Sequence, residues 1–206
     1  MKVLLINGSP HEHGCTDTAL REAAGALERR GAETEFLWLG TKPVAGCIAC
    51  QKCKETGRCL FDDQVNRLLE RLDEYDGLIV GSPVYYAGPA GQLCAFLDRF
   101  FYSGGGRMAG KPGAAVVSCR RGGASAAFDR LNKYFTISNM PVISSQYWNQ
   151  VHGRTPDDVR RDEEGMQTMR TLGENMAQFL EMQAAGRAAG VAEPRREAPV
   201  ATNFIR

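Results

Sequence analysis

A short apolar run that ends in a polar, glycine-containing loop recurs along the chain, and this recurrence constrains the fold more than any other feature. The first run, residues 3–6, leads directly into a loop that begins Asn7-Gly8-Ser9-Pro10. A strand that is apolar on both faces is typical of a parallel sheet covered by helices on both sides. With one alternating segment included, strands are predicted at residues 3–6, 33–39, 77–81, 114–117 and 142–143.

Amphipathic segments separate the predicted strands. Apolar side chains recur in them three or four positions apart, which is the spacing of a helix with one buried face. Helices are predicted at residues 16–30, after the Asp62-Asp63 pair, and at 91–101, 124–135 and 156–182. Strands that alternate with helices imply right-handed crossovers. The chain is therefore predicted to be α/β, a doubly wound three-layer sandwich with a five-stranded parallel sheet.

The domain organisation follows from where this alternation ends. The α/β domain is predicted to span residues 1–182, with a cysteine-rich loop inserted at residues 43–61. Residues 183–206 are rich in Ala, Gly, Pro and Arg and show little apolar periodicity. We expect them to form a tail, or an arm that reaches a neighbouring subunit.

Composition excludes several classes of partner. The 25 basic residues nearly balance the 24 acidic ones, so the basic surplus typical of a nucleic-acid binder is missing. The apolar run at residues 3–6 is too short for a signal peptide, and no run approaches the roughly 20 residues of a membrane span. We expect a cytoplasmic protein without a membrane or nucleic-acid partner. In that compartment the seven cysteines favour metal or redox chemistry over disulfides.

The first polar loop predicts a phosphate site. It connects a buried strand to a helix N-terminus, where free N–H groups and the helix dipole attract anions. Ser9, Thr16 and Thr18 add hydroxyl donors. The loop matches neither the P-loop nor the dinucleotide fingerprint, which favours a mononucleotide. The alternative is an ordinary turn in which Thr16 caps the helix. His11 is expected to be a polar contact near the phosphate, rather than half of a metal site with His13.

Two further loops have compositions suited to a flat ring. Tyr85 and Tyr86 stand among small residues and prolines in the second loop, where aromatic walls suit a flavin. The alternative is that both tyrosines pack beneath the helix at 91–101. The third loop, residues 118–123, is rich in Gly and Arg and offers N–H donors and a cation to a reduced flavin.

These loops read GSPHEHGCTDTAL, GSPVYYAGPAGQLCAFLDRF and SCRRGG, and a later stretch reads SSQYWN. In this order, from Met1 to about Gly153, they resemble the NAD(P)H-dependent FMN reductase group of flavodoxin-like proteins. The resemblance implies a flavodoxin-like fold, bound FMN, NAD(P)H as electron donor, and a homodimer or homotetramer. It places cofactor-binding residues at Ser9, His11, Cys15, Thr16, Thr18, Pro83, Val84, Tyr85, Tyr86, Gly88, Ser118, Gly122 and Gly123. Many relatives carry Arg at position 11 and Asn at position 15, so weaker or pH-dependent phosphate binding is expected here.

The cysteine-rich loop has the spacing C-x2-C-x2-C-x5-C. A related compact run ligates [4Fe–4S] in bacterial ferredoxins. The spacing resembles the iron–sulfur flavoproteins, a branch of the same family, and this likeness assigns Cys47, Cys50, Cys53 and Cys59 as cluster ligands. Two alternatives remain open, a structural zinc ion and a cluster-free loop with a structural or thiol-redox role.

The leading functional prediction is an enzyme in which NAD(P)H reduces bound FMN, which then reduces a quinone, a free flavin, a nitro or azo compound, or a redox partner. The alternative is an electron carrier with FMN, a [4Fe–4S] cluster and no nicotinamide site. A third reading is a dehydrogenase that uses both groups on a small carboxylic acid. A flavodoxin-type carrier is usually strongly acidic, so the neutral charge balance favours the enzyme. Hydride transfer needs an open ring face, and no catalytic residue is assigned. Tyr85, Tyr86 and Trp148 are expected to shape that face, and Asn149 and His152 to contact the substrate; the alternative for the Trp148-Asn149 pair is packing.

Overall fold

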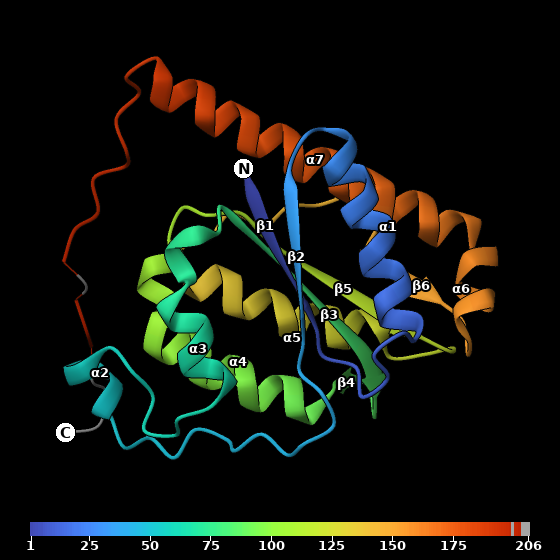
Figure 1. Ribbon diagram of the computed structural model, residues 1–206, viewed down its shortest axis with the longest axis horizontal. Coiled ribbons are helices and arrows are strands. Elements are labelled where there is room, and N and C mark those ends of the chain that lie inside the picture. Colours follow the sequence, from blue (N-terminus) through green and yellow to red (C-terminus); the bar gives the residue numbers. More distant parts are fainter. Residues whose placement is uncertain (199, 203–206) are drawn as a thin grey trace.

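The computed structural model describes residues 1–198 and 200–202. Five parallel strands are found in this part of the chain, in the order β2-β1-β3-β5-β6 (Figure 1). They are β1 (Lys2–Asn7), β2 (Glu33–Trp38), β3 (Gly77–Tyr85), β5 (Gly113–Cys119) and β6 (Gln150–His152). A two-residue strand, β4 (Gly88–Pro89), pairs antiparallel with the end of β3. This strand order confirms the predicted flavodoxin-like, doubly wound sheet, whose direction of winding reverses between β1 and β3.

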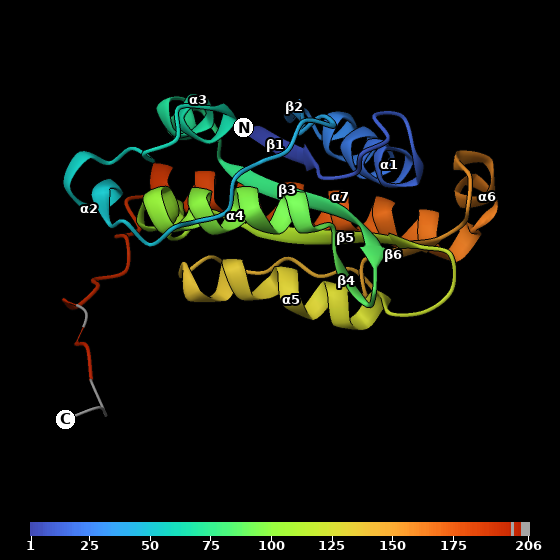
Figure 2. The ribbon, with the colours of Figure 1, turned by 90° about the horizontal axis from the view of Figure 1, so that it is seen from below.

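Helices cover both faces of the sheet (Figure 2). One face carries α1 (Cys15–Arg29), α6 (Pro156–Arg161) and α7 (Glu163–Ala188), and the other carries α3 (Gln64–Glu70), α4 (Gly91–Gly104) and α5 (Ala124–Ile137). The cysteine-rich loop contains a short helix, α2 (Lys52–Thr56), and 3-10 turns follow α3 and α4 at Leu72–Glu74 and Gly105–Met108. Alternate strand residues point to opposite faces. Val3 and Leu5 therefore enter the α1–α7 core, whereas Leu4 and Ile6 enter the core beneath α3, α4 and α5.

The last strand differs from its predicted position. Residues 142–143 make only an isolated bridge, in which Val142 pairs with Gly113 at the beginning of β5. The chain then leaves this edge and returns as β6, which pairs with the end of β5 from Val117 to Cys119. The prediction missed β6 because a three-residue strand at a sheet edge has too few apolar positions to show a period.

The helix predicted at 156–182 is two helices. Asp162 separates them with φ −77° and ψ 80°, and its carboxylate accepts hydrogen bonds from the backbone N–H groups of Gly165 and His152. One acidic side chain thus caps α7 and ties it to β6. The second helix continues to Ala188, six residues beyond the predicted end.

The segment after α7 contains neither helix nor strand in its described residues, 189–198 and 200–202. Residues 199 and 203–206 of the predicted arm lie outside the described part of the chain. Within the described part, even the longest helix, α7, lacks an apolar stretch sufficient to cross a bilayer.

Candidate functional site

The loop after β1 is braced by side chains at the strand ends. Asn7 is 2% exposed; its Oδ1 accepts from the Ser9 N–H at 3.0 Å and its Nδ2 donates to the Glu12 carbonyl at 3.0 Å. The indole N–H of Trp38, at the end of β2, donates to the Ser9 carbonyl at 2.8 Å. The Ser9 hydroxyl oxygen in turn accepts from the His11 N–H at 3.1 Å. These bonds fix the loop in a curled conformation beside α1.

The N-terminus of α1 opens into this loop. Gly14 is its N-cap residue, and no described side chain accepts a hydrogen bond from the first turn. A Cβ atom at Gly14 would lie 2.9 Å from the Cβ atom of His11, so only glycine fits at position 14 without rearrangement of the loop. Free N–H groups, the helix dipole and the nearby Ser9 hydroxyl together suit a phosphate dianion. The residues present therefore fit the phosphate of FMN.

The two predicted threonines have different surroundings. Thr16 is 1% exposed, and its hydroxyl lies 2.8 Å from that of Ser118, so it does not cap the helix. The contact joins the first loop to the end of β5. The Thr18 hydroxyl donates to the Gly14 carbonyl at 3.1 Å, which commits its proton within the helix. Thr16 is therefore a link between loops, and Thr18 is the weaker candidate for phosphate binding.

The second and third loops also meet. Gly123, the N-cap residue of α5, has φ +87°, and a Cβ atom there would lie 2.7 Å from the Cα atom of Ala87. Gly81 faces Thr16 and Leu20 so closely that an added Cβ would lie within 2.8 Å of both. All three predicted loops therefore converge at the carboxyl edge of the sheet. This is where doubly wound folds bind ligands.

The tyrosines lie on an exposed hairpin rather than beneath a helix. Val84 pairs with Pro89 and Tyr85 with Gly88, which leaves Tyr86 and Ala87 as the two turn residues. Their φ angles are +49° and +58°, values that favour glycine or asparagine. Tyr85 is 46% exposed and Tyr86 is fully exposed. The alternative in which both pack under the next helix is therefore wrong.

The other cofactor-binding residues that the family resemblance implies differ in their exposure to solvent. Ser9 and Ser118 are buried, Cys15, Pro83, Val84 and Gly88 are half-buried, and His11 and Gly122 are exposed. Burial raises the pKa of the Cys15 thiol, whose sulfur contacts the Gly153 carbonyl at 3.8 Å. The Cys15 thiol is therefore uncharged and lines the side of the first loop. His13 lies 3.5 Å from Asp17. This carboxylate also accepts from Arg21 at 2.8 Å.

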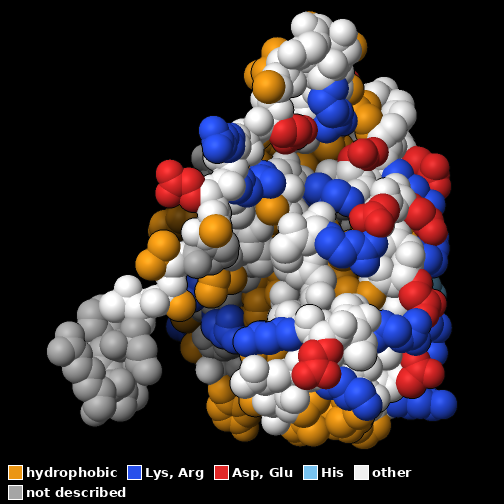
Figure 3. Space-filling view, turned by 90° about the vertical axis from the view of Figure 1, so that its left-hand side faces the viewer, with side chains coloured by type: hydrophobic (Ala, Val, Ile, Leu, Met, Phe, Trp, Pro, Cys, Tyr) orange, Lys and Arg blue, Asp and Glu red, His pale blue; other side chains and the backbone are white. Residues whose placement is uncertain are grey.

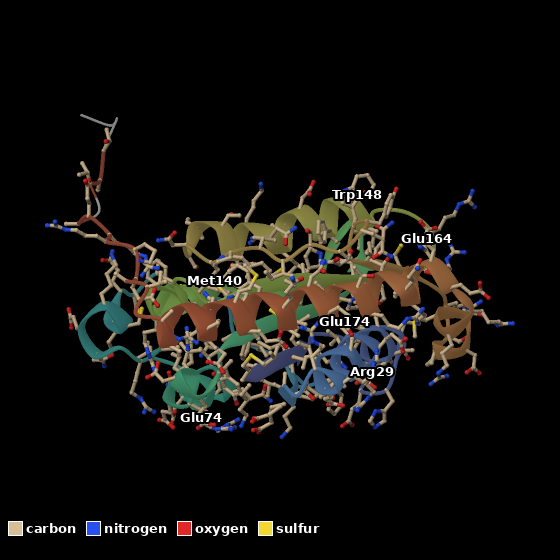
Figure 4. All side chains as sticks on the ribbon, turned by 90° about the horizontal axis from the view of Figure 1, so that it is seen from above. Arg29, Glu74, Met140, Trp148, Glu164 and Glu174 are labelled. Atoms are coloured by element: carbon tan, nitrogen blue, oxygen red, sulfur yellow. The ribbon has the colours of Figure 1, made fainter. Side chains whose placement is uncertain are left out.

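The segment before β6 contributes one exposed aromatic surface. Trp148 is 51% exposed and projects at the periphery of the molecule (Figure 4), with its ring 4.9 Å from that of Tyr147. Asn149 is 1% exposed and its Oδ1 accepts from the Ser145 hydroxyl at 2.8 Å. His152 lies 3.7 Å from Asp162. Asn149 is therefore held by its own loop through Oδ1, whereas its buried Nδ2 has no hydrogen-bond partner among the described residues, so Asn149 and Trp148 both remain candidates for a ligand contact.

A second candidate site lies in the cysteine-rich loop. Cys47, Cys50, Cys53 and Cys59 line one small cavity of about 20 Å³ that opens to solvent. Ala49 and Gln51 have φ +54° and +60°, and these left-handed residues curl the chain around the cavity. The cavity also contacts α4 through Arg99, Tyr102 and Ser103.

The spacing of the sulfurs bears on which group fits this cavity. Among residues 1–198 and 200–202, no three His, Cys, Asp or Glu side chains converge on a single metal ion. In a [4Fe–4S] cluster each thiolate binds a different iron, so the sulfurs surround a larger body. Four cysteines around one cavity are the donor set of that cluster.

Arg99 anchors the cysteine-rich loop to α4. Its side chain is 1% exposed and forms a bidentate ion pair with Asp63 at 2.6 and 2.9 Å. It also donates to the Cys59 sulfur at 3.1 Å. Burial alone would raise the pKa of Asp63, but the hydrogen bonds from Arg99 and from the Val65 N–H outweigh burial and lower it. The carboxylate therefore stays ionised opposite the guanidinium.

One helix connects the two candidate sites. The N-terminus of α4 follows β4 at the flavin loops, and Tyr102 lies three turns further on at the cysteine cavity. At 1.5 Å per residue, this stretch of α4 spans roughly 16 Å. The cavity and the three loops are therefore separate places in the fold.

Sequence reasoning missed three residues that position these sites. Asn7 and Trp38 brace the phosphate loop, and Arg99 anchors the cysteine loop. Arg99 carried a detectable signal, because it follows Phe96 by three positions and so lies on the apolar face of its helix. The sequence gives no signal for the role of Trp38, since its hydrogen-bond partner is the backbone carbonyl of a residue 29 positions away.

Known proteins with related sequences match most of the length of this chain. The sequence pattern of the family described as NADPH-dependent FMN reductase matches residues 1–154. An iron–sulfur flavoprotein from Methanocaldococcus jannaschii is 36% identical over 190 residues, which cover 88% of this chain and 98% of that protein. An iron–sulfur flavoprotein from Methanosarcina thermophila is 29% identical over 186 residues, covering 88% and 96%.

Solved structures show the same fold at low identity. RosB, determined with bound 8-demethyl-8-formylriboflavin-5'-phosphate, superposes with a TM-score of 0.70 at 15% identity, over 100% of this chain and 93% of that one. An archaeal flavodoxin superposes with a TM-score of 0.59 at 16% identity, over 88% and 99%. The fold, the match over residues 1–154 and the relatives of nearly full length together show that this chain belongs to the NADPH-dependent FMN reductase family of flavodoxin-like, FMN-binding oxidoreductases.

Proposed function

We propose that this chain is an FMN-dependent oxidoreductase that takes electrons from NAD(P)H and passes them to a quinone, a free flavin, a nitro or azo compound, or a redox protein. The observation that carries the proposal is the convergence of three loops on the uncapped N-terminus of α1. FMN, when bound, takes up an electron pair or hydride and can release its electrons one at a time.

Named residues would hold the cofactor at this edge. The Ser9 hydroxyl and the first-turn N–H groups of α1 would bind its phosphate. The hairpin of Tyr85 and Tyr86 would flank the ring, and the backbone at Gly122 and Gly123 would face the ring's polar edge. Because Trp148 is half exposed on the neighbouring segment, it would form the rim over which a substrate enters.

Removal of the Ser9 hydroxyl tests this assignment. A hydrogen bond to a charged group is worth about 1.5–3 kcal/mol, so Ser9→Ala should raise the Kd for FMN by about 10- to 150-fold. Ser145→Ala is the matched control, because that hydroxyl bonds to Asn149 and not to the phosphate loop. FMN titration of the apoprotein by fluorescence quenching measures both. Equal Kd values for the two variants would remove Ser9 from the phosphate site.

We further propose that the cysteine cavity holds a [4Fe–4S] cluster through Cys47, Cys50, Cys53 and Cys59. The support is their shared cavity and the name iron–sulfur flavoprotein carried by both relatives described above. Such a cluster carries one electron at a time. The four cysteines would supply its ligands, and Leu60, Phe61 and Tyr102 would limit its contact with water.

A second candidate function is an electron carrier with FMN and the cluster but no nicotinamide site. The cysteine cavity favours it, since a single-electron group suits exchange with a redox protein. The formal net charge of +1 argues for the enzyme. Acidic, basic and hydrophobic side chains are interspersed on the face shown in Figure 3, so this face has no acidic surface of the kind expected of a flavodoxin-type carrier.

Anaerobic reduction distinguishes the two candidates. The oxygen-free flavoprotein is mixed with NADH, NADPH or dithionite, and the visible flavin absorbance is followed in a stopped-flow instrument. The enzyme requires bleaching by NADH or NADPH. Bleaching by dithionite alone would contradict nicotinamide dependence and leave the carrier as the function.

We also propose a cytoplasmic homodimer or homotetramer. A fully exposed tyrosine on a strained two-residue turn is a surface suited to burial by another subunit. Sedimentation of the FMN-saturated protein tests this, and a monomer at micromolar concentration would contradict it.

A further inference from the structure

The guanidinium of Arg99 satisfies all of its donors inside the protein. Nε donates to the Cys59 sulfur at 3.1 Å, and Nη1 donates to the Ala45 carbonyl at 3.3 Å. Nη2 donates to the Phe61 carbonyl at 3.0 Å, and both Nη atoms donate to Asp63. Its carbon lies 5.0 Å from the centre of the Phe61 ring. A buried arginine is rare, and this one is fully paired.

These partners belong to both ends of the cysteine loop. Ala45 precedes the first cysteine, whereas Cys59 and Phe61 lie at the end of the loop. One side chain on a rigid helix therefore closes a loop that otherwise has a five-residue helix as its only regular structure. Asp63, the N-cap of α3, holds the guanidinium from the other side through its carboxylate.

We propose that Arg99 is the positioning residue of the cysteine loop, and that its charge-assisted hydrogen bond to Cys59 tunes the cluster bound there. The inference rests on the proposed cluster. A hydrogen bond from a cation stabilises negative charge on a ligating sulfur, and such bonds raise the reduction potential of iron–sulfur centres. Lysine lacks the planar fork and cannot reach Ala45, Cys59 and Phe61 together.

Arg99→Lys is the principal variant and Arg107→Lys is the matched control. Arg107 bonds to the Leu69 carbonyl and Asp73, outside the cysteine loop. Three quantities are measured in the intact chain: the midpoint potential of the reconstituted cluster, the rate of iron loss to a chelator, and hydrogen–deuterium exchange of residues 45–61 in the iron-free form. Asp63→Asn, which keeps Arg99 but weakens its anchor, serves if Arg99→Lys does not fold.

We expect Arg99→Lys to lower the midpoint potential, to lose iron about 10- to 100-fold faster, and to exchange faster at residues 45–61. Asp63→Asn should shift iron loss and loop exchange in the same direction by less; its potential is not compared, because removal of the carboxylate charge by itself raises the potential. Arg107→Lys should match the wild type. An unchanged potential together with unchanged loop exchange would overturn the proposal. If the wild type binds no iron after reconstitution, the proposed cluster fails, and unchanged exchange in the iron-free loop would still refute the positioning role.

Discussion

Gly123→Ala tests the contact that joins the second and third loops. Gly123 has φ +87°, and an added Cβ would lie 2.7 Å from the Cα of Ala87 and 3.2 Å from a Val84 methyl group. The nearest obstacle is backbone, so a rotamer change cannot relieve it. Gly122→Ala is the matched control, because an added Cβ there meets no described atom within 4 Å.

The magnitude follows from three contributions. Left-handed backbone costs an alanine about 1–2 kcal/mol. Steric overlap in a packed contact costs about 1–3 kcal/mol, and the reduced freedom of the unfolded chain returns about 0.4–1 kcal/mol. We therefore expect Gly123→Ala to lower the free energy of unfolding by about 1–4 kcal/mol. In a chain of this size each kcal/mol lowers Tm by about 2–4 °C, so the expected decrease is roughly 2–16 °C.

The assay compares thermal unfolding and FMN affinity for both variants. Displacement of the two loops should raise the Kd for FMN by about tenfold in Gly123→Ala, which corresponds to about 1.4 kcal/mol. Gly122→Ala should keep Tm close to wild type, and it is the control for stability alone because the backbone at Gly122 is itself proposed to face the ring. If the two variants unfold at the same temperature, the close approach of Gly123 to Ala87 does not shape the site.

Two further predictions concern the edge strand and the cysteine loop. Hydrogen bonds from Arg71 and Tyr75 lower the pKa of Glu35 from 4.5 to about 2. Its stabilising contribution is thus complete above pH 4.5 and lost as pH falls towards 2, so Glu35→Gln should cost up to about 3 kcal/mol at pH 7. Urea unfolding should show this difference shrinking between pH 5 and pH 2; a constant difference would refute it. Cys53→Ser should abolish iron binding but leave the Kd for FMN unchanged, because the cavity is separate from the flavin loops. Metal analysis and FMN titration decide this, and a parallel loss of FMN would contradict the separation.

The sheet was predictable because its strands are buried on both faces. Val3 to Ile6 and Leu78 to Val80 have no polar position to interrupt the run, and all are at most 2% exposed. The edge was not predictable, because β6 has one buried residue, Val151, in three. The break between α6 and α7 at Asp162 was also missed. Its carboxylate bonds to a strand ten residues earlier, and a helical period contains no information on such a partner.

The sequence predicted the edge of the sheet at which the candidate site lies, but it did not predict the side-chain contacts between the loops. The order of loops after β1, β3 and β5 fixes the edge at which they meet. The pairing of Thr16 with Ser118 spans 102 residues and is set by packing, not by a local motif. The hairpin turn contradicts local propensity, since Tyr86 and Ala87 occupy positions that usually hold glycine or asparagine. Local rules often fail in this way at functional sites.

The central claim is that one chain carries FMN at the carboxyl edge of its sheet and a [4Fe–4S] cluster in the cysteine cavity. Purification without oxygen, followed by measurement of flavin, iron and acid-labile sulfide, tests it most directly. We expect one FMN per chain, with about four irons and four sulfides. Flavin without iron would contradict the cluster and make residues 47–59 a structural or thiol-redox loop. A protein that binds no FMN, even after incubation with an excess of the cofactor, would contradict the whole account.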